Sequence, residues 1–213
     1  YETVLNVYET VLGYNGTSTH DFVPLIASAM PTNTPDFLNY TFQIRQGLTF
    51  QNGDPVTAWD VKYSITRTML FDSGSPFPPG WILSQYLVPG TFVPSTISPA
   101  LYQTLYNAIV VDNATQTVRF HLQVPAPPLL WYQVVSDQFG GGIMDHLWLE
   151  ANGPKLVWSP AGFTQYETYS FQSNYVSAWR NSAMGSGPFK ILFENNPNSI
   201  VLVPNEKFTP LPG

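Results

Sequence analysis

The strongest constraint on the fold of this chain is residues 47–65, GLTFQNGDPVTAWDVKYSI, where a tight turn leads directly into an amphipathic helix. Gly53 can take a positive φ in the turn because it has no Cβ atom to clash. Thr57 is placed to cap the helix, and Asp60, three residues later, can return a bond to the cap, as in a capping box. The stretch therefore predicts a turn and a helix N-terminus with a structural role. The expected buried stripe of this helix is Val61, Ile65 and Met69.

Hydrophobic periodicity predicts the other elements of secondary structure. Strictly alternating segments predict strands at 40–45 and 118–124. Two hairpins are expected, one through Asp112-Asn113 and one around 195–198 near the end of the chain. Strands mixed with helices predict an α/β (mixed α+β) class. Helices are expected over 1–12, 57–71, 99–109 and about 127–136, and ordered loops with little regular structure over 72–98 and 150–183.

Charged side chains are scarce, and their balance excludes one class of partner. They make up 10% of the 213 residues, against roughly 25% in an average globular domain. The 8 basic and 14 acidic side chains give a net charge of −6, so no basic face for nucleic acid is expected. The chain has no cysteine, which excludes disulfides and thiolate metal ligands. Because His20, His121 and His146 are isolated in the sequence, neither a metal site nor a cofactor is expected.

Motifs for catalysis are missing from the sequence. It has no Gly-x-Ser-x-Gly elbow, and the glycines at 140–142 lack the Lys-Ser/Thr continuation of a phosphate-binding loop. Asp54 and Asp60 could act as catalytic acids, but each also has a structural use in the turn or the cap. Asp145 and Glu150 are close in sequence, and a catalytic pair also needs a defined spatial separation. The chain is therefore predicted not to be an enzyme.

Three Asn-x-Ser/Thr sequons begin at Asn15, Asn39 and Asn113. Two of them lie next to turn residues, which favours an exterior surface that carries glycans. Chance in a sequence rich in Asn and Thr explains the sequons equally well. Glycosylation at these asparagines is therefore one of two open interpretations.

The stretch at 47–65 closely resembles the signature of the family-5 extracellular solute-binding proteins, which are oligopeptide- and dipeptide-binding receptors of ABC importers. Further segments resemble family landmarks in the same order, among them YTFQIRQG at 40–47 and GSGPFKI at 185–191. Departures occur at Ser28-Ala29-Met30, where the usual acid and Trp are missing, and over 145–183, which matches no landmark. The positions that match the signature are Gly47, Phe50, Gly53, Pro55, Thr57, Ala58, Asp60, Val61 and Ser64.

The resemblance implies a periplasmic-binding-protein-like fold with a mixed sheet, in which two lobes enclose a ligand by hinge closure. The chain is expected to be most of lobe one, with the second lobe absent. Residues 1–40 and 185–213 would form the main sheet subdomain, and about 41–184 the rest of the lobe, including a smaller subdomain. The implied location is extracellular, at the cell surface or in the periplasm, and membrane-associated in the full-length protein.

The implied function is capture of oligopeptides for the membrane permease subunits of an ABC transporter. An oligosaccharide receptor on the same scaffold is the main alternative, since abundant Trp and Tyr suit stacking on sugar rings. A third possibility, from another class, is a structural glycoprotein domain of the cell surface. Discrimination between peptide and sugar is expected to depend mostly on the second lobe.

The resemblance and the local sequence together nominate ligand contacts. Glu9, in the first helix-turn, is the main candidate, although an exposed acid on a helix face is an equal alternative. The glycine run could let the backbone approach a ligand, or could simply form a flexible loop. Trp148, Trp158 and Trp179 could stack on a ligand, although buried packing is more common for Trp. The expected ligand-binding residues are Tyr8, Glu9, Phe139, Gly140, Gly141, Gly142 and Ser186.

Overall fold

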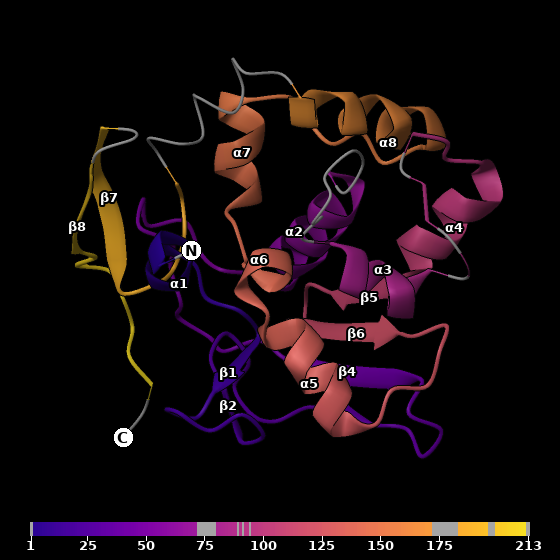
Figure 1. The fold of residues 1–213 in the computed structure, drawn as a ribbon, viewed down its shortest axis with the longest axis horizontal. Coiled ribbons are helices and arrows are strands. Elements are labelled where there is room, and N and C mark those ends of the chain that lie inside the picture. Colours follow the sequence, from indigo (N-terminus) through magenta and orange to yellow (C-terminus); the bar gives the residue numbers. More distant parts are fainter. Residues whose placement is uncertain are drawn as a thin grey trace.

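A computed structural model describes residues 2–71, 80–88, 90, 92–93, 95–171, 183–195 and 199–211 (Figure 1). The helices are α1 (Glu2–Val7), α2 (Ala58–Leu70), α3 (Trp81–Leu87), α4 (Pro99–Ala108), α5 (Pro128–Ser136), α6 (Gln138–Gly141), α7 (His146–Asn152) and α8 (Pro160–Glu167), with the 3-10 helix Thr168–Phe171 after α8. The strands are β1 (Leu12–Tyr14), β2 (Phe22–Pro24), β3 (Thr32–Asn33), β4 (Asn39–Gln43), β5 (Ile109–Asp112), β6 (Thr117–His121), β7 (Phe189–Asn195) and β8 (Ser199–Pro204).

The strands form three small sheets. The largest has the order β3-β4-β6-β5, and the other two are the β1-β2 and β7-β8 pairs. Every strand pair in the described ranges is antiparallel, so no mixed sheet is seen there. The predicted α/β (mixed α+β) class and both predicted hairpins are confirmed. The expected subdomain boundary at residue 40 falls inside β4, and the division into subdomains stays a prediction.

The four-stranded sheet buries one face under α2 and α5. Val118 and Phe120 of β6 are buried, whereas Arg119 and His121 between and after them are exposed. This alternation is the period-two pattern of a strand with one face in the core. Trp131 of α5 is fully buried, and its ring lies 5.3 Å from that of Phe120, in edge-on contact. Helix α5 is therefore fixed to the sheet by an aromatic contact.

Helix α2 begins at the capping box that the sequence predicts. The Thr57 hydroxyl accepts a hydrogen bond from the Asp60 backbone N–H at 3.3 Å. The Asp60 carboxylate in turn accepts one from the Thr57 backbone N–H at 2.8 Å. Both bonds satisfy donors that a helix N-terminus otherwise leaves unpaired. The predicted stripe of Val61, Ile65 and Met69 is buried.

Two predictions of secondary structure are wrong. The expected helix over 1–12 ends at Val7, and Leu12 instead pairs with Pro24 as the start of β1. The carbonyl of Val11 accepts hydrogen bonds from the N–H groups of Leu25 and Ala27, so contacts distant in sequence replace the helical bonds. Val11 and Leu12 are both buried in the core. An extended segment buries them as well as a helix would, so their apolar character did not distinguish the two.

The segments 72–98 and 150–183, expected to be loops with little regular structure, contain helices. They hold α3, α8 and the end of α7, while residues 172–182 lie outside the described residues. Ser159 caps α8 by accepting a hydrogen bond from the Gly162 N–H, and Pro160 occupies the first helical position. A Ser-Pro pair is a known sequence signal for the start of a helix. It was missed here because the surrounding segment is rich in aromatic residues and glycine, which favoured a loop.

A lysine of α2 is buried among aromatic rings. Lys62 is only 3% exposed, and its Nζ lies 3.7 Å from the ring centroid of Tyr106 and 5.3 Å from that of Trp158. Nζ also donates to the Tyr106 carbonyl at 2.9 Å. Burial lowers the pKa of Lys62 to about 8, whereas the aromatic faces favour the charged form.

The capping box can be tested by the change Thr57→Ala. It removes the hydroxyl that caps α2 and should lower the free energy of unfolding by about 1 kcal/mol, measured by urea denaturation, without changing ligand selectivity. Thr104→Ala is the control, because that exposed hydroxyl bonds only the Ala100 carbonyl within α4. The control should stay within about 0.5 kcal/mol of the parent, and equal losses in both variants would contradict the cap.

Lys62 gives a prediction about pH. Since its pKa is lower in the folded chain than its ordinary 10.5, the unfolded chain binds the proton more readily, and deprotonation favours folding. The free energy of unfolding of the parent, minus that of Lys62→Met, should therefore rise by on the order of 2 kcal/mol between pH 8 and pH 10.5. Urea denaturation at several pH values measures this difference. A difference that does not change with pH would show that the aromatic rings stabilise the charged Lys62 ammonium as well as water does.

Candidate functional site

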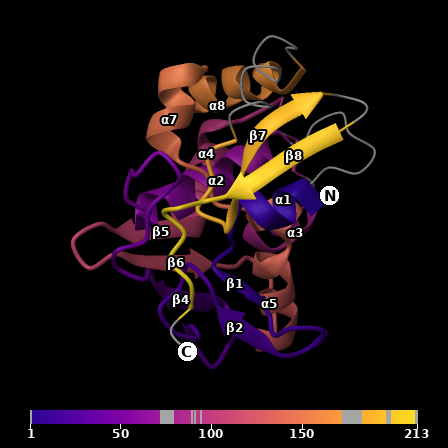
Figure 2. The same cartoon turned by 90° about the vertical axis from the view of Figure 1, so that its left-hand side faces the viewer.

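The segments that carry the expected ligand contacts converge at one place, which we call the junction: residues 8–9, 140–143 and 185–187. The Ile143 N–H donates to the Glu9 carbonyl at 2.9 Å. The Gly187 N–H donates to the Val7 carbonyl, also at 2.9 Å. The β7-β8 hairpin that follows the last segment lies across α1 (Figure 2). The junction therefore joins the start, the middle and the end of the chain.

Glycines at the junction allow backbones to touch. A Cβ atom built on Gly185 would lie 1.9 Å from the Val7 carbonyl oxygen, which no side chain can tolerate. One built on Gly142 would lie 2.9 Å from the Gln138 carbonyl oxygen and 3.4 Å from Cβ of Tyr8. These glycines are thus required by packing, and the structure shows no need for a flexible loop there.

Glu9 and Ser186 are buried side by side. They are 6% and 2% exposed, so the interpretation of Glu9 as an exposed acid on a helix face is wrong. Burial raises the pKa of Glu9, while the nearby Ser186 hydroxyl and the Arg45 charge act to lower it. Apart from that contact between them, Oε2 of Glu9 and Oγ of Ser186 have no hydrogen-bond partner in the described part of the chain. A buried carboxylate with so few partners is costly, which makes this pair a candidate for contact with a ligand.

The other expected contacts differ in exposure. Phe139 is 43% exposed, whereas Gly140, Gly141 and Gly142 are buried. Tyr8 is partly buried, and burial raises its pKa to about 12, so its hydroxyl stays protonated at neutral pH. The structure brings all these positions together, and their role in binding stays a prediction.

A hollow beside the junction was missed by the sequence analysis. It has a volume of about 590 Å³, and we call it the α6 groove. Ser136 and Gln138 line it, and Oγ of Ser136 and Oε1 of Gln138 are buried without a hydrogen-bond partner among the described residues. The signal available in the sequence was the polar Ser136-Asp137-Gln138 directly after an apolar helix. The groove is lined by Leu5, Gly13, Tyr14, Gly16, Leu25, Ser136, Asp137 and Gln138.

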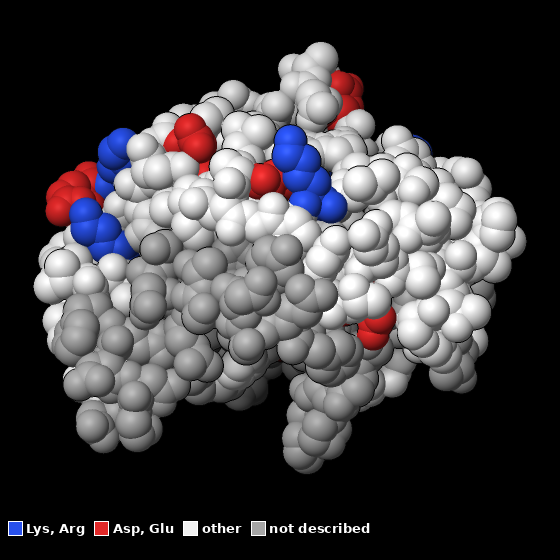
Figure 3. Space-filling model, turned by 90° about the horizontal axis from the view of Figure 1, so that it is seen from above, with Lys and Arg blue, Asp and Glu red and all other residues white. Residues whose placement is uncertain are grey.

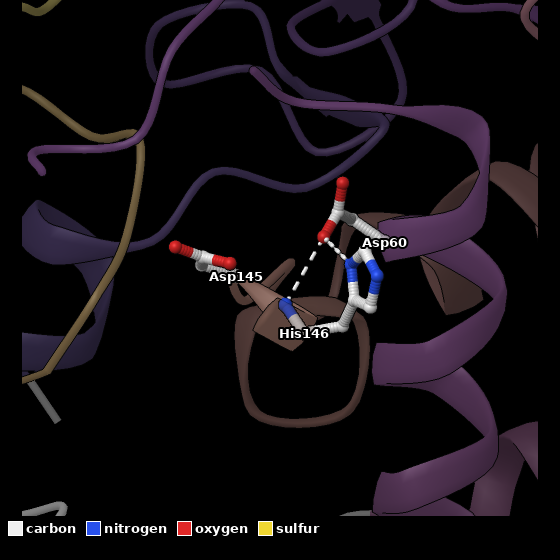
Figure 4. Close-up of side chains that lie close together, drawn as sticks. All are labelled: Asp60, Asp145 and His146. Carbon is white, nitrogen blue, oxygen red and sulfur yellow. Dashed lines mark hydrogen bonds and ion pairs between the residues drawn. The ribbon is translucent and has the colours of Figure 1, made fainter. Parts of the chain in front are cut away.

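His146 has no partner nearby in the sequence, but the fold pairs it with Asp60. Its Nδ1 lies 2.6 Å from Oδ1 of Asp60, and its backbone N–H donates to the same oxygen at 3.1 Å (Figure 4). Burial acts to lower the pKa of His146, but the hydrogen bond and the charge of Asp60 outweigh it and raise the pKa. The contact fastens α7 to the start of α2. The two partners are 86 residues apart, which is why the sequence did not reveal them.

Asp60, Asp145 and His146 are close enough together to hold a metal ion. Their donor atoms are already used within the protein, because Asp145 accepts hydrogen bonds from the Trp148 N–H at 3.0 Å and from the Asn52 side chain at 2.7 Å. Burial raises the pKa of Asp145. The cluster is explained by its role in joining α2, α7 and the turn at residue 52, and the expected lack of a metal site stays a prediction.

The three sequons lie in different environments. Asn15 and Asn113 are exposed in turns. Asn39 lies in β4, where its side chain is hydrogen-bonded to Nδ1 of His121 at 2.9 Å. Accessibility therefore favours the first two, and glycosylation stays a prediction at all three.

The tryptophans are used mainly in packing. Trp158 has its ring 5.0 Å from that of Trp59 and 5.4 Å from that of Phe163, and Trp148 packs against the core. Trp179 lies outside the described residues.

Among the described residues of the surface shown in Figure 3, charged side chains are few and lie among uncharged ones. No helix in the described ranges is both long enough and apolar enough to cross a membrane.

Residues 21–211 match the family described as bacterial extracellular solute-binding proteins, family 5, middle region. The chain belongs to this family. The resemblance of the 47–65 stretch is thereby confirmed. The family consists of solute-binding proteins and not of enzymes, in agreement with the predicted lack of catalysis.

Solved structures share the fold of this solute-binding chain. They include the OppA protein of Listeria monocytogenes bound to peptide (18% identity, TM-score 0.61), and a protein described as clavulanic acid biosynthesis oligopeptide binding protein 2 (15% identity, TM-score 0.66). Another is MoaA of A. tumefaciens R10, in complex with mannopinic acid (18% identity, TM-score 0.61). Each match covers 97% of this chain but only 34%, 32% and 32% of the respective solved chains. The chain thus spans about a third of their length. No curated protein matches its sequence.

The close packing at the junction can be tested by Gly185→Ala. Because the new methyl group would overlap the Val7 carbonyl oxygen, the free energy of unfolding should fall by more than about 3 kcal/mol. Gly16→Ala is the control, since Gly16 has open space around it and only its φ of +58° opposes a side chain. The control should cost about 1 kcal/mol. Thermal and urea unfolding measure both, and a Gly185 variant as stable as the control would contradict the contact.

Proposed function

We propose that this chain is most of lobe one of the substrate-binding component of an ABC importer, which captures oligopeptides in a cleft between two lobes. The observation that carries the proposal is the family match over residues 21–211, combined with the buried Glu9 and Ser186 side chains at the junction. The solved structures with this fold include proteins bound to peptide. The division into subdomains at 1–40 with 185–213 and at 41–184, and the missing second lobe, are parts of the same proposal.

Recognition at the junction would depend on hydrogen bonds to the peptide backbone. Glu9 and Ser186 offer buried oxygen atoms, and a peptide N–H that reached them would compete only with the contact between these two side chains. Phe139 offers an exposed aromatic ring for a ligand side chain, and the buried Gly140–Gly142 run keeps the backbone close to Tyr8. A second lobe would complete the contacts and exclude water by hinge closure. One lobe alone would therefore bind weakly.

The partners follow from the same proposal. A closed two-lobe receptor would present its surface to the membrane permease subunits of the transporter. The family name places such proteins outside the cytoplasm, and we propose that the full-length protein is associated with the membrane there.

Thermal unfolding of the full-length protein and of this chain, with pools of random pentapeptides and with a panel of oligosaccharides, tests the proposal. Ligand that binds the native state raises the midpoint, and at a hundredfold excess over Kd it stabilises by about 2.7 kcal/mol. Peptides should raise the midpoint of the full-length protein and have little effect on this chain alone. Glu9→Gln should reduce the shift, whereas Asp21→Asn, at an exposed acid outside the junction, should leave it unchanged.

Other outcomes would point elsewhere. A shift with oligosaccharides in place of peptides would establish the sugar receptor. No shift with either class would overturn the receptor and favour a structural domain of the cell surface.

A further inference from the structure

Another hollow lies where the turn between β5 and β6 meets the start of α2, and we call it the Trp59 hollow. Its volume is about 480 Å³, within the range of roughly 300–1,000 Å³ that is usual for small-molecule sites. No Asp, Glu, Lys or Arg is among its lining residues, so it suits an uncharged group. The hollow is lined by Thr57, Trp59, Asn113, Gln116 and His146.

The side chain of Gln116 fastens the turn to the helix. Its Nε2 donates to the Asn113 carbonyl at 2.7 Å, and its Oε1 accepts a hydrogen bond from the Ala58 N–H at 2.8 Å. Within the turn, Oδ1 of Asp112 accepts a hydrogen bond from the Ala114 N–H at 2.9 Å. The backbone of Asn113 is therefore held in a fixed position beside the first turn of α2.

Asn113 differs from the other two asparagines that begin sequons. It is exposed, and its side-chain amide makes no hydrogen bond within the described part of the chain. Asn39 lies in β4, with its side chain hydrogen-bonded to His121. Asn15 is exposed but does not line the Trp59 hollow. Of the three, Asn113 alone combines an unpaired amide with a place in the wall of this hollow.

The rest of the wall offers an aromatic ring and a free acceptor. Trp59 is partly exposed, and its ring is held in place by Trp158, with the centroids 5.0 Å apart. An indole ring packs well against the C–H groups of a sugar ring. Nδ1 of His146 is bound to Asp60 at 2.6 Å, so in the neutral ring Nε2 is left to accept a hydrogen bond from a hydroxyl group. A neutral sugar ring fits these partners.

We propose that Asn113 carries an N-linked glycan and that the first sugar of this glycan lies in the Trp59 hollow. A sugar bonded to Nδ2 of Asn113 is tethered at the wall, so it loses less freedom on packing there than a free sugar would. The family is described as extracellular, which is where glycan-bearing surfaces occur. The inference does not depend on the peptide ligand, because it requires only export of the chain.

Attachment requires a glycosyltransferase and a donor in which C1 of the sugar is linked to a lipid pyrophosphate. Nδ2 of Asn113 forms the new bond to C1, while the bond between C1 and the phosphate oxygen breaks and the lipid pyrophosphate leaves. One proton of the amide passes to a basic group of the transferase. The amide keeps its other N–H, and no oxidation or reduction takes place.

Mass spectrometry of peptides from the full-length protein, isolated from the cells that make it naturally, tests the attachment. We expect the mass of a sugar chain on the peptide that contains Asn113. Thr115→Ala, made in the same cells, should remove this mass, because a sequon requires a hydroxyl group at its third position. Thr115→Ser is the matched control and should retain it. Asn113→Gln removes the attachment point itself and replaces Thr115→Ala if that variant fails to fold.

Oxidation of tryptophan by hydroxyl radicals tests where the first sugar lies. Trp59 should be oxidised severalfold more slowly in Thr115→Ser than in Thr115→Ala, because the sugar covers its ring in the first variant. Trp81 is the internal reference, since it is 48% exposed and does not line the hollow. Its rate of oxidation should be the same in both variants. Mass spectrometry of the oxidised peptides measures both rates.

Three results would contradict the inference. An unmodified Asn113 in the natural protein would overturn it outright. A modified Asn113 with equal oxidation of Trp59 in both variants would show that the glycan extends into solvent, and the hollow would not hold its first sugar. If Asn113 is unmodified and added glucose or N-acetylglucosamine protects Trp59, the hollow takes a free sugar in place of a glycan. The proposed function is tested separately, by the binding of peptides.

Discussion

Direct contact between backbones holds the candidate site together. The carbonyl groups of Val7 and Glu9 receive hydrogen bonds from Gly187 and Ile143, and glycine is needed at 185 because any side chain would overlap the first segment. Backbone bonds in a buried place are short and directional, and they fix neighbouring side chains more firmly than contacts between long side chains do. Glu9 and Ser186 are buried next to each other as a consequence, and so their oxygens are left facing each other rather than water.

The family signature supports this junction without forming part of it. The backbone N–H of Gln51, in the turn before α2, donates to the Gly185 carbonyl at 3.0 Å, and the side chain of Gln51 donates to the Ala183 carbonyl. At the other end of the stretch, Asp60 holds His146 and thereby the start of α7. The turn and the cap thus position two segments that lie more than eighty residues away. This structural role explains why so much of the stretch has a defined conformation although the chain has few charges.

Local signals made much of the fold predictable. The capping box at Thr57 and Asp60, the turn at Asp112-Asn113 and the alternation in β4 and β6 depend on residues close in sequence, and the structure confirms each of them. The end of α1 at Val7 was not predictable, because the segment after it is held by partners more than a dozen residues away, such as Leu25 and Ala27.

The candidate site was predictable only in part, for the same physical reason. Resemblance to the family nominated Tyr8, Glu9 and Ser186, and the structure brings them together. Their burial could not be deduced, because it arises from a contact between the two ends of the chain. The pairing of His146 with Asp60 and the grouping of Ser136, Asp137 and Gln138 with Leu5 also depend on tertiary contacts.

The distance in sequence between the partners at the junction has a consequence for synthesis of the protein. Val7 and Gly187 are about 180 residues apart, so the carbonyl of Val7 has no native partner until almost all of this chain has left the ribosome. At typical rates of translation that delay is roughly 10–40 s. During this time the segment around Val7 and Glu9, whose side chains are buried in the folded protein, is exposed to solvent. A chaperone that holds unfolded segments would therefore have its main opportunity at the N-terminal end of this chain, and the junction would be among the last parts to form.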